Sequence, residues 1–160
     1  MSKSDTLKVA PSPQDDRDWI WQTMGNFPPT LSLDYRSELL PVRNQGTQSS
    51  CFAFAAACMK EWQEKQDYGL EEYLSPQFLY NNRFNLYDYD YTNDEGMYSR
   101  NVMKLLLKIG ICTELSFPYG RLDSKEHIES DIYEEAHRHI SVLSYYHAFP
   151  CEMGQSIECR

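Results

Sequence analysis

The 160-residue sequence lacks the features of a membrane protein or a nucleic-acid-binding protein. It has no run of about 18 apolar residues, which a membrane-spanning helix requires. Its first segment, MSKSDTLKVAPSPQDDRDW, has no apolar stretch of the kind found in secretion signals. Basic residues are outnumbered, with 15 Lys and Arg against 24 Asp and Glu, so a formal charge of −9 opposes binding to polyphosphate. We therefore expect a cytoplasmic protein with no membrane and no nucleic acid among its partners.

Paired cysteine motifs are also missing. The five cysteines, at positions 51, 58, 112, 151 and 159, are odd in number and show no C-x-x-C spacing. This usage is typical of reduced thiols rather than of a disulfide framework or a zinc site. The acidic segment 88–94, DYDYTND, is superficially similar to a calcium loop but has Asn93 where that loop requires glycine. We expect no metal and no cofactor.

What is present predicts a folded protein with two strand segments. Aromatic residues make up 14% of the chain, more than disordered sequences usually carry. Residues 1–26 are polar and contain two prolines, so we expect a flexible leader there. Leu31, Leu33 and Tyr35 alternate with polar residues, as in a half-buried strand. The β-branched and aromatic residues of segment 140–149 predict a second strand.

Helical segments are expected between these strands. Residues 50–65 have apolar residues at steps of three and four, which predicts an inward face made of Cys51, Phe54, Ala55, Cys58, Met59 and Trp62. The Ser-Pro pair at 75–76 is a favourable helix start. A further helix should begin near Ser99 and end at Gly110, and segment 124–139 is amphipathic. This order favours an α+β protein over alternating parallel βα units.

Cys51 is the first candidate for chemistry, because it opens an Ala-rich helix after a glycine-containing turn. The thiolate is the reactive form of cysteine, and the unpaired N–H groups at a helix N-terminus favour that anion. Gln45, six residues earlier, could aim its amide at the point that the Cys51 N–H faces, and two such donors form an oxyanion hole. On these residues alone, a packed apolar thiol is the simpler explanation, since free cysteine is commonly buried.

A longer pattern changes this interpretation. The segment LDYRSELLPVRNQGTQSSCFAFAAA, residues 33–57, resembles the start of the mature region of papain-like cysteine peptidases, including bleomycin hydrolase and bacterial relatives. Three later segments resemble the family in the same order: LSPQFLY at 74–80, DEGMYSRNVMKLLLKIGI at 94–111 and SFPYG at 116–120. Four matches in order make ancestry the better explanation of the cysteine and its surroundings.

The resemblance implies roles for individual residues. Cys51 would attack the carbonyl carbon of a peptide bond, while Gln45 and the Cys51 N–H would bind the oxyanion. Gly96 would line the substrate cleft, with Met97 and Tyr98 at the rim of a pocket that prefers apolar side chains. The substrate would be a peptide or protein, and the reaction would need no cofactor.

The sequence also departs from the family pattern. Gln48 and Asn93 stand where the family has two cysteines joined by a disulfide, and the absence of both is what an intracellular member would show. Phe52 replaces a tryptophan, which keeps an aromatic ring but loses its N–H. Glu95 replaces the first of two cleft glycines, which would narrow the cleft or add charge to it.

The family's catalytic histidine and asparagine follow the nucleophile by about 130–150 residues, which lies beyond Arg160. The histidines at 127, 137, 139 and 147 are expected to lie away from the cleft. The expected organisation is a leader at 1–26, a mostly helical left domain at 27–139, and the first strands of a truncated antiparallel barrel domain at 140–160. The fold class is thus α+β and papain-like.

Two functions follow from this organisation. The first is a cysteine peptidase that forms an acyl-enzyme and is weak or inactive as this chain alone. The alternative is a non-catalytic remnant that binds a peptide or docks with a partner chain. An incomplete barrel leaves apolar faces and strand edges uncovered, so we expect a homo-oligomer or a covering partner.

Overall fold

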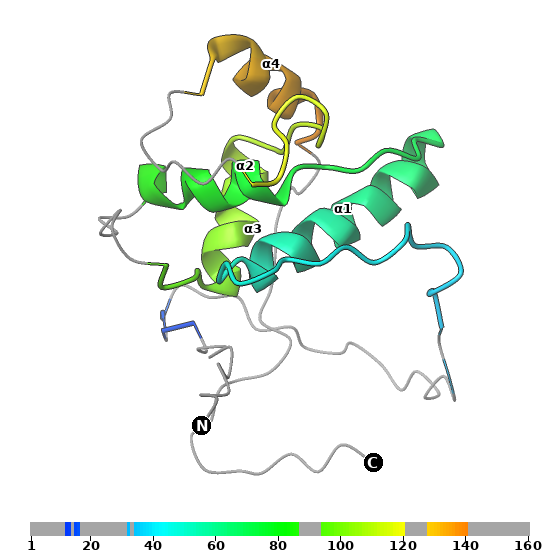
Figure 1. Ribbon diagram of the computed structural model, residues 1–160, viewed down its shortest axis with the longest axis horizontal. Helices are drawn as coiled ribbons and strands as arrows, with labels where there is room; N and C mark the ends of the chain where they lie inside the picture. Colours follow the sequence, from blue (N-terminus) through cyan, green and yellow to red (C-terminus); the bar gives the residue numbers. More distant parts are fainter. Residues whose placement is uncertain are drawn as a thin grey trace.

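The computed structural model describes residues 12–13, 15–16, 32, 34–86, 94–120 and 128–140. In this part of the chain the elements are α1 (Cys51–Tyr68), α2 (Pro76–Asn81), the 3-10 helix η1 (Asn82–Leu86), α3 (Ser99–Lys108) and α4 (Ser130–Arg138). Helices α1, α2 and α3 contact one another, and α4 lies above α2 in Figure 1. The described residues therefore form a helical body with segment 34–50 running along α1 (Figure 1).

The helical part of the α+β expectation is confirmed, and the β part is not. Over the residues that the structure describes, β pairing is limited to one isolated antiparallel bridge between Leu74 and Thr113. Of the strand expected at 31–35, residues 32, 34 and 35 are described and have no strand conformation. The strand expected at 140–149 lies outside the described residues, apart from its first residue.

Helix α1 buries a different face from the one predicted. Its buried residues are Ala53, Ala56, Ala57, Lys60, Glu61 and Glu64. The residues expected to face inward are half-buried (Cys51, Phe54, Cys58, Trp62) or exposed (Ala55, Met59). The prediction was wrong because charged residues were assigned to solvent, whereas Glu61 pairs with Arg43 and Lys60 pairs with Glu64. A buried charge is tolerated when it is paired.

The ends of α2 and α3 agree with the sequence signals. The Ser75 hydroxyl accepts the Phe78 N–H at 3.0 Å, and proline opens α2. Beyond the end of α3, Gly110 has a φ of 76°, a left-handed conformation that glycine adopts without steric cost. A Cβ at this position would lie 2.0 Å from the carbonyl oxygen of Ala136, so the glycine also allows α4 to pack closely.

The core consists of two clusters. The larger combines α1, α2 and α3 through Ala53, Ala56, Ala57, Leu74, Leu79, Tyr80, Met97, Val102, Leu105, Leu106 and Ile111. The smaller joins α4 to α2 and the loop after α3 through Phe78, Cys112, Phe117 and Ala136. The larger cluster thus packs the first turns of α1 against Met97, and the smaller packs Phe117 against α2 and α4.

Candidate active site

The loop before α1 carries the predicted oxyanion residue. Gly46 has a φ of 61°, and the Asn44 side-chain oxygen accepts the Gly46 N–H at 2.8 Å, which makes a tight turn. The Gln45 side-chain amide donates one N–H to the carbonyl oxygen of Gln48 at 2.8 Å. Gln45 is therefore folded back toward the chain that enters α1 at Cys51.

The N-terminus of α1 is left open by its capping residue. The Ser50 carbonyl accepts the Phe54 N–H at 3.0 Å, but within the described structure the Ser50 side chain makes no capping hydrogen bond. Its hydroxyl lies 3.0 Å from the hydroxyl of Tyr119 instead. The first N–H groups of a helix have no carbonyl partner within the helix, and together they favour an anion. The half-buried thiol of Cys51 lies at this end.

The other described thiols have a different environment. All three described cysteines are free, with Cys112 buried and Cys58 half-buried. Burial raises the pKa of Cys58, and Glu61 raises it further. Burial also raises the pKa of Cys112 strongly, with a smaller contribution from Glu135. Both thiols are thereby held in the unreactive protonated form at neutral pH.

Tyr119, in the segment SFPYG, connects the two parts of the site. Its hydroxyl donates to the Gln45 carbonyl at 2.7 Å and lies next to the Ser50 hydroxyl. Its ring meets that of Phe54 edge-on, with centroids 4.8 Å apart. The sequence placed Tyr119 in a family-like turn but gave no signal for this role, because the partners lie 69 and 74 positions away.

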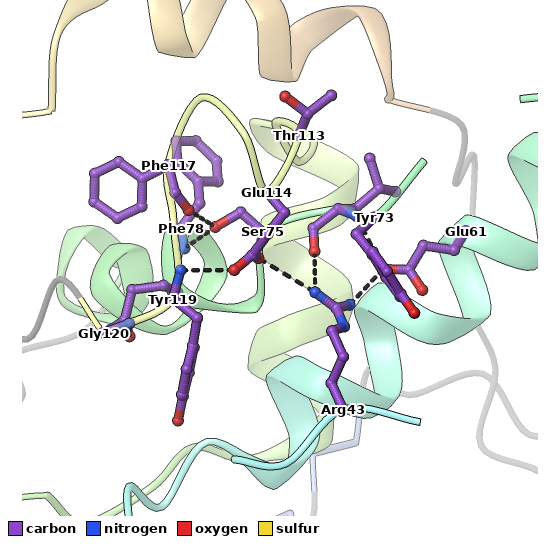
Figure 2. A network of polar contacts seen from close by, with 12 residues as sticks. Arg43, Glu61, Tyr73, Ser75, Phe78, Thr113, Glu114, Phe117, Tyr119 and Gly120 are labelled. Atoms are coloured by element: carbon purple, nitrogen blue, oxygen red, sulfur yellow. Dashed lines mark hydrogen bonds and ion pairs between the residues drawn. The ribbon is translucent and has the colours of Figure 1, made fainter. Parts of the chain in front are cut away.

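A polar network around Arg43 fixes the start of the same loop (Figure 2). The Arg43 guanidinium donates to the Leu74 carbonyl at 3.0 Å and to Glu114 at 3.2 Å, and it pairs with Glu61. Its charge also lies 4.5 Å from the centre of the Tyr73 ring. Because one side chain contacts three distant segments, the loop can shift only if the network breaks.

Asp94 holds the loop from the opposite side. Both of its carboxylate oxygens accept the Ser49 N–H, at 3.0 and 2.8 Å, and it also accepts the Tyr80 hydroxyl. Burial raises the pKa of Tyr80, and the bond to Asp94 adds to this effect, so the phenol stays a donor. Gly96 packs here too, since a Cβ on it would lie 3.2 Å from the Ser49 carbonyl oxygen. The sequence did not single out Asp94.

The three residues predicted to bind substrate lie in one segment. Gly96 has a φ of 81° and lies against the residue that precedes the cap of α1. Met97 is 7% exposed and belongs to the larger core cluster, so its side chain packs inside the protein rather than at an open rim. Tyr98 is half-buried and caps α3 with its backbone. Their contact with a substrate stays a prediction.

The described histidines are far from Cys51. His137 is exposed, and the His139 Nδ1 lies 3.5 Å from a carboxylate oxygen of Glu64. Glu64 follows Cys51 by 13 residues along α1, which corresponds to about 20 Å at the helical rise. His127 and His147 lie outside the described residues. The described part of the chain thus brings no imidazole to the thiol.

The described residues contain no group of three or more His, Cys, Asp or Glu side chains that could hold a metal ion. None of the described helices is both long enough and apolar enough to cross a membrane.

Comparison with known proteins gives consistent relatives. No family model matches the chain. It is 33% identical over 102 residues to a cysteine protease of Blomia tropicalis, covering 61% of this chain and 30% of that protein. The fold is similar to xylellain, a cysteine protease from Xylella fastidiosa, with a TM-score of 0.62 and 24% identity, covering 81% of this chain and 54% of that one.

A solved structure from a study of antibody cross-reactivity between the mite allergens Blo t 1 and Der p 1 is also similar, with a TM-score of 0.53 and 26% identity. It covers 79% of this chain and 39% of the allergen chain. The chain therefore spans between 30% and 54% of the length of these relatives. The Blomia tropicalis relative and xylellain are cysteine proteases, the class of protein that the motifs around Cys51 indicated.

Proposed function

Because this chain is related to the N-terminal portion of papain-like cysteine proteases, we propose that it carries the nucleophile and the oxyanion donors of a cysteine peptidase. One observation supports this most directly. The end of α1 that bears Cys51 has N–H groups that its capping serine leaves free, and Gln45 is folded back beside it. The substrate is a peptide or protein, in a reducing cytoplasmic compartment.

The chemistry divides into two steps. The Cys51 thiolate attacks the peptide carbonyl carbon, and the carbonyl π electrons move to oxygen, where the Cys51 N–H and the Gln45 amide stabilise the charge. The C–N bond then breaks as the leaving amine takes a proton, which yields a thioester. Water hydrolyses the thioester, restoring the thiol and releasing the carboxylic acid.

The proton in these steps needs a carrier, and loss of a general base typically costs a factor of about 10²–10⁴ in rate. His139 lies too far along α1 to serve. We therefore expect weak peptidase activity from the 160-residue chain alone. A second domain or a partner chain would supply the base and cover the cleft beside Gly96.

The proposal is tested by the site of covalent labelling. The chain is treated with iodoacetamide or the epoxide E-64 at neutral pH, and the modified residues are followed by mass spectrometry. Cys51 should react at least about tenfold faster than Cys58 or Cys112, whose pKa values are raised by burial. Cys51→Ser should abolish the fast phase, and Cys58→Ser is the matched control. Equal rates at all thiols would refute the proposal.

The alternative is a non-catalytic module that binds peptides. It is favoured by the absence of an imidazole near Cys51 among the described residues. In this case Cys51→Ala should bind peptides as tightly as the parent chain, and E-64 should label Cys51 no faster than it labels Cys58. A fast E-64 reaction would exclude this function.

A further inference from the structure

The Tyr119 hydroxyl connects Gln45, whose side-chain amide is the proposed oxyanion donor, to Ser50, the residue before Cys51. Tyr119 donates its single proton to the Gln45 carbonyl oxygen at 2.7 Å. The Ser50 hydroxyl, 3.0 Å away, must therefore be the donor in its bond with the Tyr119 oxygen. Gln45 and Ser50 are five positions apart in sequence, and this hydroxyl ties them to one point.

Tyr119 is itself held in place. Its backbone N–H donates to Glu114 at 2.7 Å, and the other oxygen of Glu114 accepts from Arg43 at 3.2 Å (Figure 2). The edge-on contact with Phe54 fixes the ring against the first turn of α1. Burial raises the pKa of Tyr119, so its hydroxyl remains a donor at neutral and moderately alkaline pH.

The Ser50 hydroxyl is bonded to Tyr119 and not to the helix. Serine at this position normally caps a helix by accepting an N–H from its first turn. Here the Ser50 hydroxyl is directed to Tyr119, and no side-chain cap is formed in the described structure. The N–H groups at Cys51 and beyond therefore stay available to an anion. The Ser50 backbone, with φ of −98° and ψ of 20°, also differs from the extended conformation of a capping serine.

We propose that Tyr119 is a positioning residue for the oxyanion site: by joining the Gln45 carbonyl to the Ser50 hydroxyl, its own hydroxyl fixes Gln45 relative to Cys51. This inference rests on the proposed function, since it assigns Tyr119 to the same site. Tyr119 itself touches no reacting atom. Its effect should therefore be confined to steps in which negative charge develops on a carbonyl oxygen.

Two thiol reagents separate this role from a general structural one. A short peptide aldehyde with an apolar side chain adds to Cys51, forming an S–C bond while the former carbonyl oxygen takes up the thiol proton. This hemithioacetal depends on the oxyanion donors. Iodoacetamide alkylates the same sulfur with loss of iodide and places no charge on a carbonyl oxygen bound at the donors. Both are measured on the 160-residue chain, the first by NMR with a ¹³C-labelled aldehyde carbon.

In Tyr119→Phe we expect the dissociation constant of the aldehyde adduct to rise about tenfold, as for loss of one well-placed hydrogen bond. The iodoacetamide rate at Cys51 should stay within about twofold. Gln45→Ala should weaken the adduct at least as much, and the double variant should show no further loss. Tyr133→Phe, which removes the hydroxyl bonded to Asn82 at 2.7 Å on the α4 side, is the matched control.

The outcomes are distinct. An adduct unchanged in Tyr119→Phe but weakened in Gln45→Ala overturns the role of Tyr119 and leaves the proposed function intact. An adduct that is absent in the parent chain, or unaffected by Gln45→Ala, overturns both. Unfolding would expose buried Cys112 to alkylation, which the same mass spectra detect. If Tyr119→Phe unfolds, Ser50→Ala replaces it, with an expected weakening of about threefold; an unchanged adduct would refute the inference.

Discussion

The start and the middle of α1 use polar groups in opposite ways. At the end that starts with Cys51, the Ser50 hydroxyl and the Gln45 carbonyl bond to Tyr119, and backbone N–H groups of the helix are left open. Further along, Glu61 and Lys60 are buried and paired with charges. The difference shows that the buried charges lie about two and a half to three turns from the thiol and reach the loop of the site through Arg43.

Removing the buried carboxylate of Glu61 should give the largest loss of stability. Glu61→Ala leaves the Arg43 guanidinium with Glu114 as its remaining ion-pair partner, and it leaves the Leu74 N–H, now bonded at 2.9 Å, without an acceptor. Removal of one partner from a buried pair costs about 3–5 kcal/mol. Urea unfolding measures the loss. Glu71→Ala, which breaks the more exposed pair with Lys65, is the control and should leave stability almost unchanged.

Removing Asp94, which holds the loop before α1, should lower the free energy of unfolding by a smaller amount. Asp94→Ala frees the Ser49 N–H and the Tyr80 hydroxyl, and hydrogen bonds to a charged group contribute about 1.5–3 kcal/mol. Asp94→Asn keeps an oxygen acceptor and should lose less than half of this. If Asp94→Ala unfolds at the same urea concentration as the parent, the loop is held by Arg43 and Tyr119 alone.

The pH dependence of stability should distinguish the network around Glu61 from the site at Cys51. Burial raises the pKa of Glu61, although the Leu74 N–H and Arg43 oppose the shift. Just above the ordinary glutamate pKa, the folded chain then holds a proton that the unfolded chain has lost, so stability falls as pH rises through this window. Glu61→Gln, which does not titrate, should flatten that fall. Tyr119→Phe should leave this pH profile unchanged. A parent profile as flat as that of Glu61→Gln would show that Arg43 compensates the burial.

Much of this arrangement follows from local sequence signals. Ser75 and proline start α2, and Gly110 follows α3 in the left-handed conformation, because these signals act over a few neighbouring residues. Cys51 was placed at a helix start with Gln45 in the preceding turn, and the structure agrees. The family resemblance supplied their roles.

The interactions that the sequence did not predict join residues far apart in the chain. The buried face of α1 contains Glu61, which is stable there only because Arg43 and Leu74, 18 and 13 positions away, satisfy it. Asp94 bonds to a backbone N–H 45 positions earlier, and such a contact leaves no periodic signature in the sequence. Hydrophobic periodicity alone could not identify either interaction.

We propose that Cys51 and Gln45 together form the acyl-transfer half of a peptidase site. Single-turnover acylation with a nitrophenyl ester of an N-acylated peptide tests this assignment, because its leaving group needs no proton. Cys51 should be acylated as nitrophenolate leaves, and Gln45→Ala should slow this step by about 10²-fold. Gln66→Ala, which removes an exposed amide on α1, should leave the acylation rate unchanged. Acylation at an equal rate in Gln45→Ala, or nitrophenolate release that persists in Cys51→Ser, would contradict the claim.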